Sequence, residues 1–177
     1  ETLSHALCVF TLTQAWIPDW GTLWNSPTWF LSALLFCNIL FPLILPKICT
    51  FSREKLFKLW IIVALTHLAI NLWYSQKAGV AIMEGMERDN SWSDFFRFFP
   101  VWNFLDFFLG VITARLYMMR PNPVCDTKAK VLPLVFLALI IGFIVLRAYI
   151  PINDMLSRSA VFIPLCCAFI FYLTPDK

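Results

Sequence analysis

The sequence predicts an all-α protein, a polytopic transmembrane helix bundle with about five to six spans. Of its 177 residues, 60% are hydrophobic and only 14% are charged, which lies outside the usual composition of a soluble domain. The apolar residues gather into runs about as long as a bilayer core is thick. Basic residues gather in alternate loops between these runs, as they do in multi-pass membrane proteins.

The first full span is predicted at residues 28–45. Trp29 stands at its start, and Ser32, Cys37 and Asn38 lie within it. Each polar group in hydrocarbon must find a partner inside the protein or it costs free energy. We therefore expect this helix both to anchor the chain and to line a cavity.

Other apolar runs predict the remaining helices. Residues 3–16 are expected to be the end of a span. A short interfacial helix is predicted further along the chain, because four aromatic residues recur there at the spacing of one helical face: Trp92, Phe95, Phe96 and Phe99. The residues between 150 and 159 are expected to form a short turn. Further spans are predicted at 56–74, 101–119, 131–150 and 160–173.

Residues 1–177 are expected to form one transmembrane domain that is truncated at both ends. The first residue is Glu1 rather than Met, nothing resembles a cleaved leader, and the last apolar run is short.

Charge predicts the orientation of the bundle. The loops at 47–58 and 115–130 each carry four basic residues against one acid, whereas those at 17–27, 75–100 and 150–159 are neutral or slightly acidic. Because basic loops remain on the cytosolic side, the first two are expected to be cytoplasmic.

Metal sites and nucleic-acid partners are not expected. The net charge of +3 is small, and no basic stripe carries interleaved aromatic residues. Cys49 and Cys125 lie in loops without the spacing of a zinc site. The other four cysteines lie inside apolar runs, where a thiol packs as a small hydrophobic group: Cys8, Cys37, Cys166 and Cys167.

Ser32, His67, Asn71 and Asp106 are expected at similar depths, in the half of the membrane away from the basic loops. Ionisable groups within spans tend to face a cavity or a partner, so these residues are predicted to line a cavity. The alternative is a structural hydrogen-bonded network. Asp106 and His67 form a possible acid and base pair, and Gly110 is expected to permit a close helix contact.

Three stretches resemble the membrane-bound acyltransferase 3 family. The glutamine-tryptophan exit of that family is similar to residues 12–18, LTQAWIP. Its W-S-L-S-x-E-x-x-F-Y-x-x-x-P helix is similar to residues 25–42, NSPTWFLSALLFCNILFP. Residues 103–110, NFLDFFLG, resemble its R-L-P-E-F-L-L-G helix, with Asp106 at the acidic position and Gly110 at the glycine. The order and spacing of the three elements fit, and the resemblance covers most of the chain.

This resemblance implies an integral membrane O-acyltransferase. It would move an acyl group, expected to be acetyl, from an acyl-CoA donor to a hydroxyl of a carbohydrate or lipid, without a bound cofactor. The family's histidine base would lie upstream of Glu1, so His5 and His67 inherit no role.

The chain also departs from the family pattern. Leu34 occupies the position of the family's glutamate, so a divergent branch would use another group or the activity would be weakened. An inactive homologue used as a scaffold and a transporter-like bundle are therefore alternatives. Of the helix motif the chain keeps Trp29, Leu31, Ser32 and Pro42, and it replaces other positions with Phe30, Leu34 and Asn38.

Overall fold

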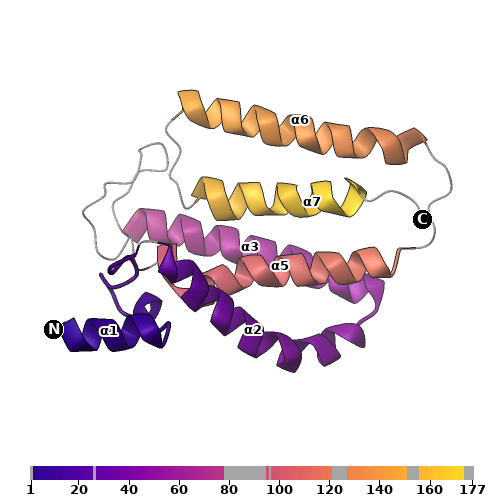
Figure 1. Ribbon diagram of the computed structural model, residues 1–177. Coiled ribbons are helices and arrows are strands. Elements are labelled where there is room, and N and C mark those ends of the chain that lie inside the picture. Colours follow the sequence, from indigo (N-terminus) through magenta and orange to yellow (C-terminus); the bar gives the residue numbers. More distant parts are fainter. Residues whose placement is uncertain are drawn as a thin grey trace. The chain divides into compact units, whose positions relative to one another are not determined.

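The computed structural model describes residues 2–25, 27–77, 95, 97–120, 127–150 and 156–173. All regular elements in these residues are helices, which confirms the predicted all-α class. In chain order they are α1 (Thr2–Phe10), η1 (Gln14–Trp16), α2 (Thr28–Cys49), α3 (Arg53–Lys77), α5 (Pro100–Met118), α6 (Thr127–Tyr149), η2 (Leu156–Phe162) and α7 (Ile163–Leu173) (Figure 1).

Four helices of the described chain are long and apolar enough to cross a membrane, compared with the five to six spans expected. The apolar helix at Ser159–Leu173 is shorter. The four spanning helices match the predicted spans at 28–45, 56–74, 101–119 and 131–150, and they are Thr28–Cys49, Arg53–Tyr74, Pro100–Met118 and Val131–Tyr149.

Helix α2 contains Pro42 and extends beyond its predicted end at residue 45, through Pro46, to Cys49. Each proline removes one backbone N–H from the helical ladder, but a helix still satisfies the other backbone groups of a membrane segment. The prediction of a loop over 47–58 is therefore wrong, because only residues 50–52 separate α2 from α3.

The start of α3 follows from its sequence. The Ser52 hydroxyl accepts a hydrogen bond from the backbone N–H of Lys55 at 3.3 Å, as a residue preceding a helix often does. Glu54 lies in the first turn, where a negative charge interacts favourably with the helix dipole. Its carboxylate also forms an ion pair with Lys58, one turn later, at 2.6 Å.

The N-terminal helix ends earlier than expected. The prediction of one helix over residues 3–16 is wrong, because α1 stops at Phe10 and η1 begins at Gln14. The Thr11 hydroxyl donates to the carbonyl oxygen of Leu7 at 2.7 Å, and Leu12 has a φ of 56°. This left-handed backbone ends the helix.

The predicted turn at 150–159 is also partly wrong. Residues from Leu156 belong to the π-helical segment η2, which continues into α7. Pro164 lies in the first turn of α7, where its missing N–H is tolerated. Trp92 and Phe96 of the predicted interfacial helix lie outside the described residues, as does Cys125.

Contacts divide the chain into two compact units. The first unit contains residues 1–47 and 86–107, and the second contains residues 48–85 and 108–177. The single transmembrane domain expected from the sequence stays a prediction.

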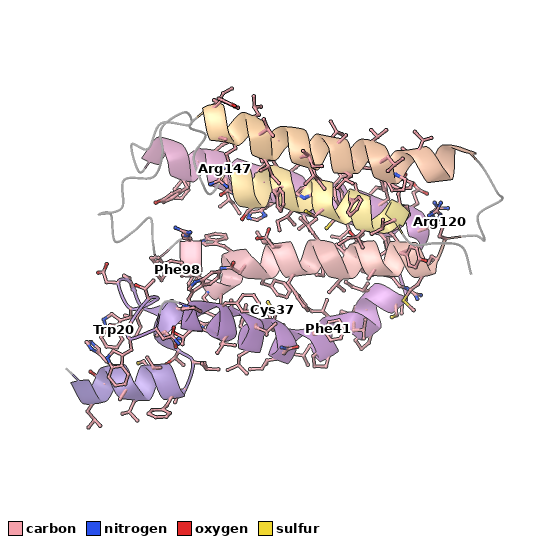
Figure 2. The ribbon with its side chains drawn as sticks, turned by 45° about the horizontal axis from the view of Figure 1, so that its top comes forward. Trp20, Cys37, Phe41, Phe98, Arg120 and Arg147 are labelled. Carbon is pink, nitrogen blue, oxygen red and sulfur yellow. The ribbon has the colours of Figure 1, made fainter. Side chains whose placement is uncertain are left out.

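Aromatic side chains form the centre of the first unit. The Trp16 ring meets Phe36 of α2 and Phe99 edge-on, with ring centroids 5.0 and 5.3 Å apart. The Trp29 ring lies against Phe98 at 5.1 Å. A Cβ added to Gly21 would be 2.8 Å from Cδ2 of Phe98, so only glycine permits this approach. Trp20 packs on His5 of α1 (Figure 2).

In the second unit, α6 and α7 lie side by side and run in opposite directions (Figure 1). The Arg115 guanidinium at the end of α5 donates to the carbonyl oxygen of Cys49 at 3.0 Å. Arg120 donates to the carbonyl oxygen of Phe171 near the end of α7 at 3.5 Å. These bonds bring the two predicted basic loops and the end of α7 to one end of the unit, which we call the arginine end.

Candidate functional site

The four predicted polar residues are divided between the units. Ser32 and Asp106 belong to the first unit, whereas His67 and Asn71 belong to the second. A shared layer of all four would join both units, so it stays a prediction, and each pair is described within its own unit.

Ser32 is buried on α2, with only 1% of its surface exposed, and its hydroxyl has no hydrogen-bond partner among the described residues. Ala33 and Cys37 are buried beside it, so this stripe of α2 faces the interior of the unit. Asp106 of α5 is half-buried and interacts electrostatically with Cys37. The structure therefore places Ser32, Cys37 and Asp106 within one packed region.

Gln14 is a buried polar residue that the sequence analysis did not select. It is fully buried in η1, and neither its amide nitrogen nor its amide oxygen has a partner among the described residues. Its neighbour Ala15 lines a cavity of about 70 Å³ together with Asp19 and Thr22. That volume is large enough to hold water. The signal in the sequence was the polar residue inside the motif LTQAWIP.

Two other predicted residues of α2 have different surroundings. Trp29 is half-buried and packs on Phe98 at 5.1 Å. Asn38 is exposed, and its side-chain amide donates to the carbonyl oxygen of Leu34 at 2.9 Å. The Asn38 side chain is thus satisfied within its own helix.

His67 and Asn71 are buried together on α3, with 4% and 2% of their surfaces exposed. The Asn71 amide donates to the carbonyl oxygen of His67 at 2.8 Å. The Asn71 side chain is therefore hydrogen-bonded within its own helix, in line with the alternative of a structural hydrogen-bonded network.

Gly110 does not provide the close helix contact that was expected. It is exposed, and a Cβ there would meet no atom of the described residues within 4 Å. Instead it lines a cavity of about 250 Å³ with Thr113 and Cys167, in the second unit.

A further cavity lies in the second unit. Its volume is about 720 Å³, within the range of small-molecule sites in proteins. Side chains from α3, α5, α6 and α7 surround it. Its apolar lining consists of Phe57, Leu116, Phe136, Ala168 and Phe171.

Polar groups in the cavity lie at two levels. The charged residues Arg53 and Glu54 lie in the first turn of α3 and line the cavity at the arginine end. Trp60 and Thr113 lie further along their helices, and the Trp60 indole N–H donates to the Thr113 hydroxyl at 3.0 Å. That hydroxyl in turn donates to the carbonyl oxygen of Leu109 at 2.7 Å. The Trp60 and Thr113 side chains therefore bond to each other rather than to a ligand.

Beyond Trp60 several side chains of the second unit are packed, whereas Thr113 also lines the separate cavity of about 250 Å³. Leu109 and Ile112 of α5 have no exposed surface, and Val63 of α3 and Ile140 of α6 are buried. The cavity therefore ends against packed side chains at Trp60 and has its charged residues at the opposite end, as a site for an amphipathic molecule requires.

The cavity residues were not among those predicted from the sequence, although their spacing contains a signal. Arg53, Phe57 and Trp60 follow one another at i, i+4 and i+7, and so share one face of α3. Comparisons with protein-family models, with curated proteins and with solved structures give no match to this chain.

Proposed function

We propose that this protein is an integral membrane O-acyltransferase that moves an acyl group from an acyl-CoA-type donor to a hydroxyl of a carbohydrate or lipid. The observation that carries the proposal is the 720 Å³ apolar cavity with an arginine at one end, in a unit that contains helices of spanning length. An acyl chain needs an apolar, water-free site, whereas its activated head group is polar and charged.

In the proposed reaction, the hydroxyl oxygen of the acceptor forms a bond to the acyl carbonyl carbon. The bond from that carbon to the donor's sulfur breaks, and the hydroxyl proton passes to the released thiolate. The motifs of residues 12–18, 25–42 and 103–110 support this reaction class by their resemblance to the acyltransferase 3 family.

The acceptor would be bound by polar groups outside the cavity. Trp29 and Ser32 are our candidates in the first unit, because Ser32 is buried without a partner in the described chain and Trp29 offers an aromatic face. Asp106 would supply a further hydrogen bond in the same unit, and the basic loops would lie in the cytosol near the donor.

The test is acyl transfer in membranes that contain the protein, with radiolabelled acyl-CoA and mixed glycan and lipid acceptors. Ala168 lines the cavity, so Ala168→Trp should fill it and reduce transfer at least tenfold. Ala138→Trp is the matched control, since Ala138 is an exposed residue of the spanning helix α6 and does not line the cavity.

No acyl transfer by the wild-type protein with any donor and acceptor would contradict the proposed activity. Equal loss in the two variants would show instead that added bulk, rather than a filled cavity, reduces the rate.

A further inference from the structure

We infer that the cavity of the second unit limits the length of the acyl chain it accepts, with Trp60 at its closed end and Arg53 and Arg120 binding an anionic head group. This inference rests on the proposed function in treating the bound molecule as the donor. It goes further by naming the ligand as a medium-chain anionic amphiphile rather than an acetyl donor.

The depth of the cavity follows from the positions of its lining residues. From Arg53 to Trp60 the axis of α3 rises about 10 Å at 1.5 Å per residue. Extended chains advance about 1.2 Å per bond, so about eight to ten carbons reach from the arginine end to Trp60. The 720 Å³ volume is also far larger than an acetyl group needs.

Trp60 is the residue that can set this limit. Its ring adds bulk at this end of the cavity, and its indole N–H donates to the Thr113 hydroxyl of α5. The residues behind it include Leu109 and Ile112, which are fully buried. A chain longer than the cavity would have to displace Trp60 or the packed core.

Arg53 and Arg120 are the charged residues near the cavity whose hydrogen-bond donors remain for a ligand. Arg53 lines it and has no hydrogen bond or ion pair within the described residues, whereas the adjacent Glu54 is paired with Lys58. Arg53 therefore retains all its donors for a phosphate or carboxylate.

Arg120 follows the end of α5, at the end of the second unit away from Arg147 (Figure 2). Its guanidinium lies over the rings of Phe171 and Tyr172, with centroid distances of 5.6 and 5.7 Å, and both rings line the cavity. Its hydrogen bond to the Phe171 carbonyl is long, at 3.5 Å, so most of its donors remain for a ligand. Arginine side chains from two helices thus flank the charged end of an apolar site.

The test measures binding without transfer. The protein in lipid nanodiscs is photolabelled with an octyl phosphate that carries a diazirine at its terminal carbon, and unlabelled alkyl phosphates from butyl to hexadecyl compete. Empty nanodiscs correct for partition into lipid. Affinity should rise about fourfold per methylene, from about 0.8 kcal/mol each, and stop rising between octyl and decyl.

In the Trp60→Ala variant, the affinity for alkyl phosphates should continue to rise with chain length to dodecyl or beyond. Trp60→Phe and Thr113→Val should leave the limit unchanged, because both keep bulk at the closed end while removing the hydrogen bond. Arg53→Gln and Arg120→Gln should each weaken alkyl phosphates about tenfold and leave alkyl alcohols unaffected. Lys55→Gln is the matched control, since Lys55 lies over Phe51 and does not line the cavity.

A wild-type affinity that continues to rise to hexadecyl, or an unchanged limit in a Trp60→Ala protein of normal helical content, would overturn the inference. Length-limited binding without any acyl transfer would leave this inference standing and count against the proposed function alone.

Discussion

At the scale of single residues, the most informative side chains are polar groups that the fold buries. Gln14 is fully buried and Ser32 nearly so, and within the described chain neither side chain has a hydrogen-bond partner. A buried amide without a partner costs about 1–3 kcal/mol. Gln14 and Ser32 both lie in the motifs of the first unit that resemble the acyltransferase family, so this loss of stability falls within those motifs.

Replacing Gln14 with Leu should therefore stabilise the protein. An apolar side chain of similar size removes the desolvation cost of the amide, by about 1–3 kcal/mol, and keeps the packing. The measurement is the midpoint of thermal unfolding in detergent, by circular dichroism. Gln14→Ala is the control, since it removes the amide but leaves a cavity and should be less stable than Gln14→Leu. A lower midpoint for Gln14→Leu would show that water or a ligand bonds the amide.

The sequence predicted some of these residues but not their surroundings. Ser32 stood out because it interrupts an apolar run, and the structure buries it. Asn38 interrupts the same run, yet it is exposed and bonds to Leu34 of its own helix. The two differ because their positions on the helix differ, and the sequence alone does not say which face of α2 is covered.

At the scale of elements, apolar length was enough to predict the spanning helices. The bounds of α5 differ from the predicted 101–119 by one residue at each end. The bounds of α1 and α2 differ more from the prediction. Pro42 and Pro46 argue against a helix in water, but α2 continues because a membrane segment must satisfy its backbone internally.

The Trp60 to Thr113 hydrogen bond joins α3 and α5 in the second unit. Thr113→Val removes the acceptor and leaves the indole N–H without a partner, so it should cost about 0.6–1.7 kcal/mol, the range known for polar contacts between membrane helices. Unfolding in mixed detergent measures this loss. Trp60→Phe combined with Thr113→Val should cost little more than either change alone. Additive losses would mean that the two side chains do not act together.

At the scale of the whole molecule, the pairing of basic segments is the feature that bears on orientation. The Arg115 bond to the Cys49 carbonyl joins both predicted basic loops at the arginine end of the second unit. Figure 2 shows Arg147 of α6 at the other end of that unit from Arg120. Two basic segments at one end of a unit agree with the charge rule that placed them on the same side of the membrane.

The proposed orientation can be tested with the exposed thiol of Cys49. In a variant that keeps Cys49 as its single cysteine, a membrane-impermeant maleimide should label it in inverted vesicles and not in right-side-out vesicles. The matched control carries Thr22→Cys instead, at an exposed position of the opposite loop, and should show the reverse. Labelling of Cys49 from the outside would reverse the proposed topology.

The sequence by itself determined the class of this protein, because spanning helices and alternating charge follow from the cost of exposing polar groups to lipid and of burying charge in it. It also singled out Ser32, His67 and Asn71 as polar residues within spans. Only the tertiary structure decided which helix faces are covered and which side chains surround a cavity. The site of Arg53, Trp60 and Thr113 depends on contacts between residues more than fifty positions apart, and helical periodicity cannot specify such contacts.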